Sequence, residues 1–132
     1  MTSPIDIPAA PPKRIVLIDD EAGVVLALRL LLQSMGFDVE ALSDPQKALD
    51  YICQGSSGAA LNHVDLVLCD LRMPVKNGFE VLTEIKQFAP NLPCIIMSGH
   101  AEDAEQKKAL ALGAKAFLSK PFGPDELRRV MA

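Results

Sequence analysis

Three short apolar runs in this chain are each followed, at once or after a single serine, by charged residues, and this pattern limits the possible fold more than any other feature. Residues 15–18 are followed by Asp19 and Asp20, residues 66–69 by Asp70, and residues 116–118 by Ser119 and Lys120. Apolar runs of this length that alternate with helical stretches are typical of buried parallel strands, whose carboxyl ends meet at one edge of the sheet. We therefore expect the acidic residues and the lysine to share one site.

Carboxylates that crowd together repel one another, so each resists ionisation unless a cation lies among them. A hard divalent ion such as Mg²⁺, with an ammonium group beside it, meets this requirement and suits phosphoryl transfer. The sequence thus predicts a cation-dependent phosphoryl site at the sheet edge.

Composition is consistent with one compact domain behind a short leader. Residues 1–13 hold four of the ten prolines and little that could pack, so we expect a flexible leader and a folded domain over residues 14–132. The net charge of -4 argues against direct contact with nucleic acid, and no apolar run approaches the ~18 residues of a membrane span. Cys53, Cys69 and Cys94 lack metal or redox spacing, which predicts structural thiols in a reducing cytoplasm.

Strand and helix patterns alternate from Arg14 onward. Val24, Leu28, Leu31 and Met35 lie on one face of a helix that should end near Gly36. We further expect an edge strand at 37–42 and a helix from Asp44 that turns Ala48, Leu49 and Ile52 inward, followed by a loop at 54–63. The remaining expected elements are a helix at 78–88, a buried strand at 94–97, a helix at 101–112, a strand near 115–119 and a short helix from Pro124. Five strand and helix repeats with right-handed crossovers predict an α/β fold, a doubly wound parallel sheet with helices on both faces.

From about residue 14 to its end the chain resembles a response-regulator receiver domain of two-component signalling. Each of four short motifs follows an expected strand: Asp19-Asp20-Glu21, residues 70–78 from Asp70 to Gly78, Ser98-Gly-His-Ala101, and Lys120-Pro-Phe122. The resemblance implies a five-stranded, flavodoxin-like sheet in the order 2-1-3-4-5. It also implies that Asp70 is the phospho-acceptor, for which the alternative from the residues alone is a surface aspartate in a turn.

The resemblance implies a Mg²⁺ site as well. In such a site Asp20 and Asp70 ligate the ion directly, the Arg72 backbone carbonyl adds a third protein oxygen, and Asp19 acts largely through water. A helix N-cap is the alternative for Asp19 or Asp20, since a helix begins just after them. Glu21 is interpreted as a first-turn residue rather than a ligand.

Three further residues have roles implied by the resemblance. Lys120 supplies a charge for a phosphoryl oxygen, and its bond to Pro121 is expected to be cis, as is typical of the family. Ser98 is the switch hydroxyl, with a turn-capping serine as the alternative. Phe117 takes the place of the aromatic ring that follows the movement of that hydroxyl, without the tyrosine hydroxyl often found there. His100 either tunes water access, as Arg72 does, or is an exposed loop residue.

The sequence therefore predicts a Mg²⁺-dependent phospho-acceptor, phosphorylated on Asp70 by a sensor histidine kinase or a histidine phosphotransfer protein. We expect a cytoplasmic signalling switch with self-catalysed phosphoryl transfer and autodephosphorylation, not a metabolic enzyme. A phosphatase of the haloacid-dehalogenase type would need an acid where Arg72 stands, and a flavin module would need a phosphate loop where Asp19 and Asp20 stand. A receiver that only binds partners is the remaining alternative. Whether an effector domain follows Ala132 is left open.

Overall fold

The computed structural model describes residues 13–56, 63–100 and 102–131, without the side chains of residues 55 and 56. A single parallel sheet forms the centre, with strands β1 (Arg14–Ile18), β2 (Asp38–Leu42), β3 (Leu66–Asp70), β4 (Cys94–Ser98) and β5 (Ala116–Ser119) in the order β2-β1-β3-β4-β5. This confirms the predicted fold class and strand order.

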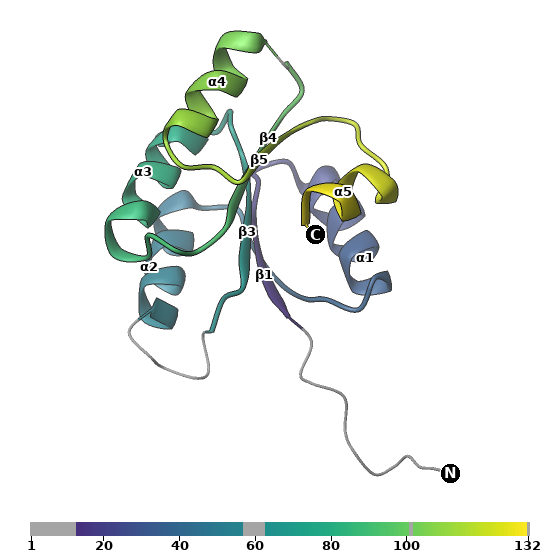
Figure 1. The fold of residues 1–132 in the computed structure, drawn as a ribbon. Helices are drawn as coiled ribbons and strands as arrows, with labels where there is room; N and C mark the ends of the chain where they lie inside the picture. Colours follow the sequence, from purple (N-terminus) through teal and green to yellow (C-terminus); the bar gives the residue numbers. More distant parts are fainter. Residues whose placement is uncertain (1–12, 57–62, 101, 132) are drawn as a thin grey trace.

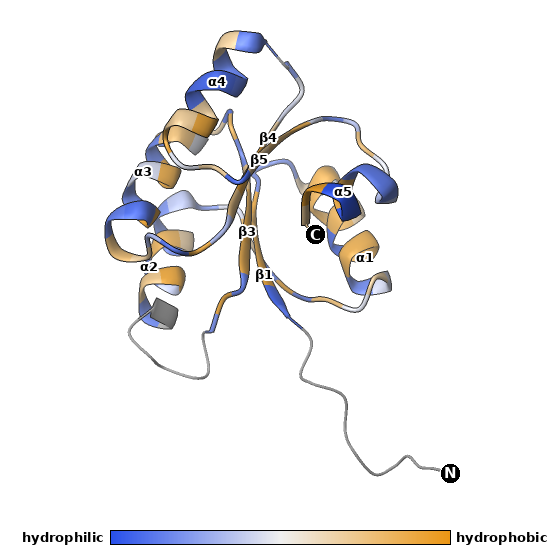
Figure 2. Ribbon diagram, in the orientation of Figure 1, coloured by the Kyte–Doolittle hydropathy of each residue, from blue (hydrophilic) through white to orange (hydrophobic). Residues whose placement is uncertain are grey.

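Five helices cover the two faces of the sheet. Helices α2 (Pro45–Ser56), α3 (Gly78–Phe88) and α4 (Asp103–Ala111) lie on one face, and α1 (Ala22–Ser34) and α5 (Pro124–Met131) lie on the other (Figure 1). The hydropathy colouring shows apolar residues along the inner strands and polar residues on the outer sides of the helices (Figure 2). None of the described helices is long and apolar enough to cross a membrane.

The core is divided by the sheet into two apolar clusters. Val16, Val67 and Ile96 belong to the cluster under α2, α3 and α4, whereas Leu17, Leu68 and Met97 belong to the cluster under α1 and α5. Neighbouring residues on a strand point to opposite faces, so each inner strand contributes to both clusters. Because both faces are covered, β1, β3 and β4 are apolar almost without interruption.

Most predicted elements are confirmed, with changes at their ends. The predicted helix at 78–88 has the observed bounds, and an Asn77–Glu80 capping box begins it. Asp44 accepts a hydrogen bond from the Gln46 backbone at 2.9 Å, as expected of a cap for α2. The helix face predicted for α1 omitted Leu32, which is fully buried.

The largest differences from the predicted boundaries lie at the end of α2 and at the start of α4. The loop expected at 54–63 does not begin at Gln54, because α2 continues to Ser56; residues 57–62 of that loop lie outside the described residues, as do residues 1–12 of the predicted leader. The helix expected from residue 101 begins at Asp103, with Glu102 as its N-cap.

Candidate functional site

The predicted site lies at the carboxyl edge of the sheet, where three strands bring their last residues together. Asp19 follows β1, Asp70 is the last residue of β3, and Lys120 follows β5. Parallel pairing sets this arrangement, since Ile18 pairs with Cys69 and Asp70 pairs with Met97. The peptide bond between Lys120 and Pro121 is cis, as predicted.

One ammonium group bridges two buried carboxylates. Lys120 Nζ donates to Asp19 Oδ2 at 2.7 Å and to Asp70 Oδ1 at 3.0 Å. The side chains of Asp19 and Asp70 are 0% and 6% exposed, and that of Lys120 is 15% exposed. Charged groups this deeply buried are stable only with paired partners, so the three side chains depend on one another.

The pKa values show a site with excess negative charge. Burial raises the pKa of Asp70, the charges of Asp19 and Asp20 raise it further, and the hydrogen bond from Lys120 only partly opposes the shift. Burial alone would lower the pKa of Lys120, but the hydrogen bonds to Asp19 and Asp70 outweigh it and raise the pKa. A divalent cation would reduce the repulsion that remains.

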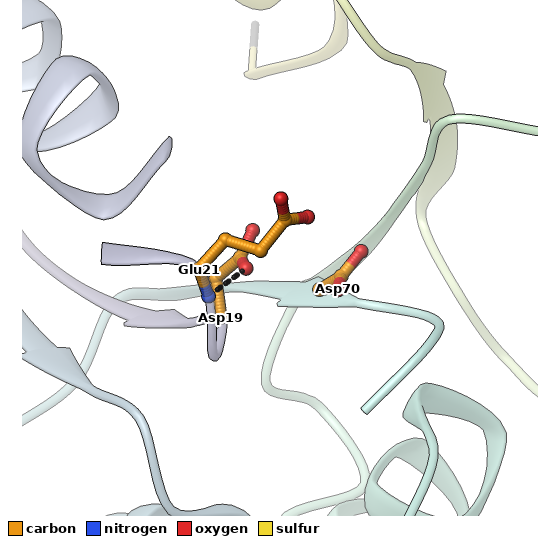
Figure 3. A group of neighbouring side chains, drawn as sticks. All are labelled: Asp19, Glu21 and Asp70. Atoms are coloured by element: carbon orange, nitrogen blue, oxygen red, sulfur yellow. Dashed lines mark hydrogen bonds between the residues drawn. The ribbon is translucent and has the colours of Figure 1, made fainter. Parts of the chain in front are cut away.

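The acidic cluster differs in one member from the predicted set. Side-chain oxygens of Asp19, Glu21 and Asp70 lie within 4.8 Å of one another (Figure 3). Asp20 is exposed and is not a member of this group. Glu21 is the N-cap of α1 rather than a first-turn residue, and its backbone N–H donates to Asp19 Oδ1 at 3.0 Å. Because Glu21 precedes the first helical residue, its side chain remains at the sheet edge.

A glycine supports the backbone beneath Asp70. A Cβ atom at Gly78 would lie 2.7 Å from the Asp70 carbonyl oxygen and 2.9 Å from Leu71 Cα, and the Gly78 N–H donates to the Leu71 carbonyl at 2.8 Å. Any side chain at this position would push the first turn of α3 away from the end of β3. Gly78 therefore holds the loop after Asp70 close to the sheet.

The hydroxyl of Ser98 lies at the same edge but is bound to its own turn. It donates to the His100 carbonyl at 3.2 Å and accepts from the His100 N–H at 3.0 Å, and Ser98 is fully buried. The turn-capping role considered for Ser98 is therefore present. On the next strand, Phe117 is half-buried, pairs with Ile96 and packs on the cluster under α2, α3 and α4.

The side chain of Arg72 points to a partner that the sequence did not suggest. It forms an ion pair with Glu105 of α4, thirty-three residues along the chain. No sequence periodicity relates a loop residue to a distant helix residue, so only the fold could identify this pair. His100 is exposed.

Comparisons with known proteins agree with this geometry. The family model described as "Response regulator receiver domain" matches residues 15–132. The chain is 38% identical over 113 residues to the transcriptional regulatory protein FixJ of Bradyrhizobium diazoefficiens, a match that covers 86% of the chain and 52% of FixJ. It is 32% identical over 121 residues to the transcriptional regulatory protein SphR of Synechococcus elongatus, covering 90% and 47%. The chain thus spans about half the length of the curated relatives it matches.

Solved structures of similar fold include two with a TM-score of 0.80. One is a response regulator receiver domain protein from Clostridium thermocellum, 28% identical, with 90% of each chain covered. The other is in the CheX-CheY-BeF3-Mg complex from Borrelia burgdorferi, 25% identical, with 91% of this chain and 87% of that chain covered.

Proposed function

The chain belongs to the response regulator receiver domain family, and from this membership we propose that it is switched by phosphorylation of Asp70. Receiver domains are signalling switches of two-component systems, so the reaction serves to change a state rather than to make a product. The observation that carries the proposal is the ammonium of Lys120, which bridges the buried carboxylates of Asp19 and Asp70. A carboxylate beside such a group is a suitable nucleophile for phosphorus.

In the proposed transfer an Asp70 carboxylate oxygen attacks the phosphorus of a phosphohistidine. The oxygen–phosphorus bond forms as the phosphorus–nitrogen bond breaks, and the imidazole leaves with its electron pair. Lys120 already contacts Asp70 at 3.0 Å, so its ammonium is placed to bind an oxygen of the transferred group. Water then attacks the phosphorus of the acyl phosphate, the bond between phosphorus and the Asp70 oxygen breaks, and inorganic phosphate leaves as the carboxylate is restored.

The acidic edge fits a Mg²⁺ ion because, within the described residues, its carboxylates outnumber the ammonium groups that contact them. We assign Asp20, Asp70 and the Arg72 backbone carbonyl as direct ligands, with Asp19 acting through water. Asp20 is exposed and has no hydrogen bond or ion pair within the described residues, so its carboxylate is available. The ion would supply positive charge to the phosphoryl oxygens as they approach.

We assign the switch to Ser98 and Phe117. A phosphoryl oxygen offers the Ser98 hydroxyl a charged acceptor in place of the neutral His100 carbonyl, and hydrogen bonds to charged acceptors are stronger. The turn after β4 would then lose the hydrogen bond from the Ser98 hydroxyl to the His100 carbonyl. The half-buried Phe117 ring on β5 would follow the movement of that hydroxyl. Ser98 and Phe117 thus connect the phosphoryl site to the surface near α4.

The proposed partners are a sensor histidine kinase or a histidine phosphotransfer protein as donor, and an effector or a fused output domain as target. The chain spans about half of its matched relatives, which leaves room for such a domain in the whole protein. We propose a reducing, cytoplasmic location because Cys69 and Cys94 are buried thiols outside any disulfide. Burial raises the pKa of Cys94 to about 11, which keeps it protonated.

The proposal is tested by treating the chain with acetyl phosphate and Mg²⁺ and following its intact mass. One phosphoryl group should be added, hydroxylamine should remove it, and a chelator should prevent its addition. Asp70→Asn should abolish the adduct, while Asp65→Asn, at the other end of the same strand, should keep it. Persistence of the adduct in Asp70→Asn, or an alkali-stable label on Ser98, would refute the assignment.

A further inference from the structure

Helix α4 is held to the rest of the domain by little apolar burial. Of the residues in α4, only Ala109 is buried, and Leu110 is 53% exposed. The first turns of the helix are coloured mostly hydrophilic (Figure 2). Contacts between charged side chains and the neighbouring elements therefore matter more for the position of α4 than for α1 or α3.

Two such contacts tie α4 to the segment that follows Asp70. The guanidinium of Arg72, two residues after Asp70, pairs with the Glu105 carboxylate in the first turn of α4. The ammonium of Lys108 lies 4.7 Å from the ring centroid of Phe79, at the start of α3. Only the first contact involves a residue next to the phosphoryl site.

Glu105 depends strongly on Arg72. Its side chain is 18% exposed, and its second oxygen, Oε1, is buried without a hydrogen-bond partner among the described residues. A carboxylate in this state relies on its remaining ion pair, because removing one partner leaves an uncompensated buried charge. The Arg72 side chain is 54% exposed, so it has room to turn away.

The space around the pair permits this movement. A groove of about 450 Å³ lies between the β3–α3 loop and α4, lined by Leu71, Arg72, Met73, Asn77, Phe79 and Glu105. Arg72 borders this groove and is separated from Asp70 by a single residue. The guanidinium can leave Glu105 without displacing the core.

We propose that Arg72 and Glu105 form a latch that holds α4 in the unphosphorylated chain, and that a phosphoryl group on Asp70 opens it by drawing Arg72 away. The proposal rests on Asp70 being the phospho-acceptor. A phosphoryl group carries one to two negative charges and three acceptor oxygens, which makes it a stronger partner for a guanidinium than one carboxylate. Loss of Arg72 leaves the Glu105 carboxylate without its counter-charge, and α4 loosens.

Because coupling between two sites acts in both directions, the latch should also affect the binding of a phosphoryl mimic at Asp70. If phosphorylation must break the latch, then a chain without the latch should bind a phosphoryl mimic more tightly. Glu105→Gln should raise the affinity for beryllofluoride with Mg²⁺ about fivefold, at the low end of known coupling between sites. In an Arg72→Ala background the same substitution should change nothing, since the latch is already absent; this variant keeps the Arg72 backbone carbonyl.

Amide hydrogen exchange in α4 supplies the second measurement. Without beryllofluoride, Glu105→Gln should exchange faster in α4 than the wild type, and beryllofluoride should bring the wild type toward the same rate. Glu84→Gln removes the ion pair between Lys76 of the same loop and α3, and should leave α4 unchanged. Lys108→Met should speed exchange in α4 without raising the affinity for beryllofluoride.

Equal affinity and equal α4 exchange in wild type and Glu105→Gln would overturn the latch. A gain in affinity that persists in the Arg72→Ala background would overturn it as well, because the effect would not pass through Arg72. Failure of the wild type to bind beryllofluoride refutes the phospho-acceptor role and the opening step. The exchange comparison without beryllofluoride still decides whether Arg72 and Glu105 hold α4.

Discussion

The two ends of strand β3 carry the same residue type in opposite electrostatic conditions. Asp65 stands just before the strand, accepts from the Arg14 N–H at 2.8 Å and hydrogen-bonds His63 Nε2 at 2.9 Å. Burial alone would raise the pKa of Asp65, but these hydrogen bonds outweigh it and lower the pKa. At the other end, burial and two neighbouring carboxylates raise the pKa of Asp70 despite Lys120.

The difference lies in the surroundings, not in the residue. The Asp65 side chain is 29% exposed and has partners matched to its charge, so it stabilises the fold. The Asp70 side chain is 6% exposed and shares the Lys120 ammonium with Asp19. A buried negative charge that is only partly compensated lowers the stability of the fold. Such a site can bind a cation, which would in turn favour a phosphoryl group. The charge of Asp65 at the amino edge of the sheet is therefore well compensated, whereas that of Asp70 at the carboxyl edge is not.

The largest expected effect comes from removing the shared ammonium. Lys120→Met should lower the free energy of unfolding by about 3 kcal/mol at neutral pH, because two buried carboxylates lose their counter-charge. Mg²⁺ should then stabilise the variant more than it stabilises the wild type. Urea unfolding with and without Mg²⁺ measures both.

A matched control for this change is the exposed ion pair between Arg128 and Asp125, whose side chains are 60% and 94% exposed. Arg128→Met should alter the free energy of unfolding by less than about 0.5 kcal/mol. If Lys120→Met were no more harmful than Arg128→Met, the carboxyl edge would not differ from an ordinary charged surface.

The next effect concerns which carboxylate completes the cation site. Asp20→Asn should weaken Mg²⁺ binding about tenfold, equivalent to about 1.4 kcal/mol. Glu21→Gln removes the same charge and should have a much smaller effect. The Mg²⁺ dependence of the melting temperature reports the affinity of each variant. The reverse order would assign the ion to the Asp19, Glu21 and Asp70 cluster as the structure has it.

Neutralising the aspartates at the two ends of β3 should change the free energy of unfolding with opposite signs. Without metal at neutral pH, Asp70→Asn should stabilise the fold by about 1 kcal/mol, as relief of a strained functional site often does. Asp65→Asn should destabilise it by about 1 kcal/mol through a weakened hydrogen bond to the Arg14 backbone. If both substitutions changed the free energy of unfolding in the same direction, the two ends of β3 would not differ in electrostatic compensation.

Asp70 and Asp65 should also contribute to the pH dependence of stability with opposite signs. An aspartate with a raised folded pKa binds more protons in the native state, so Asp70 makes stability fall as pH rises through the window above about 4. Asp65 has a lowered folded pKa, so its contribution is full above about 4 and is lost as pH falls through the folded value. Relative to the wild type, Asp70→Asn should therefore gain stability with rising pH, and Asp65→Asn should lose it.

The sequence predicted the carboxyl edge well because the pattern there is local. Apolar runs that end on Asp19, Asp70 and Lys120 identify both the strands and the residues at their ends, and the parallel sheet then brings those ends together. The bounds of α3 were equally accessible, since Asn77 and Glu80 mark its start.

The errors arose where local pattern carries no information. The apolar period of α2 ends at Ile52, so the sequence pattern predicts a loop where the last turn of the helix lies. Arg72 and Glu105 lie thirty-three residues apart and meet only after α4 packs beside the β3–α3 loop. Glu21 is predicted in the first turn of α1 but is its N-cap, a shift of one residue that the apolar pattern of the helix does not resolve.

The smallest expected effect lies in the backbone just after the carboxyl end of β3. Val75 has a φ of 73°, the only positive φ of a non-glycine residue in the described ranges, and it is fully exposed. The Lys76 N–H donates to the Pro74 carbonyl at 2.8 Å, which makes Val75 the centre of a γ-turn. A β-branched residue is strained in this conformation by about 1–3 kcal/mol, whereas glycine costs about 0.5–1 kcal/mol in chain entropy. Val75→Gly should therefore raise the free energy of unfolding by about 0.5 kcal/mol.

Val75→Ala separates backbone strain from loss of the exposed side chain. Alanine keeps the Cβ atom, which is the source of strain at positive φ, and removes the two exposed methyl groups as glycine does. It should leave stability within about 0.3 kcal/mol of the wild type, or lower it slightly. Urea unfolding of the three proteins side by side resolves such differences through the midpoint. An equal gain in Val75→Ala and Val75→Gly would mean that the exposed methyl groups, and not the backbone, limit stability here. The carboxyl end of β3 would then differ from its amino end in charge alone.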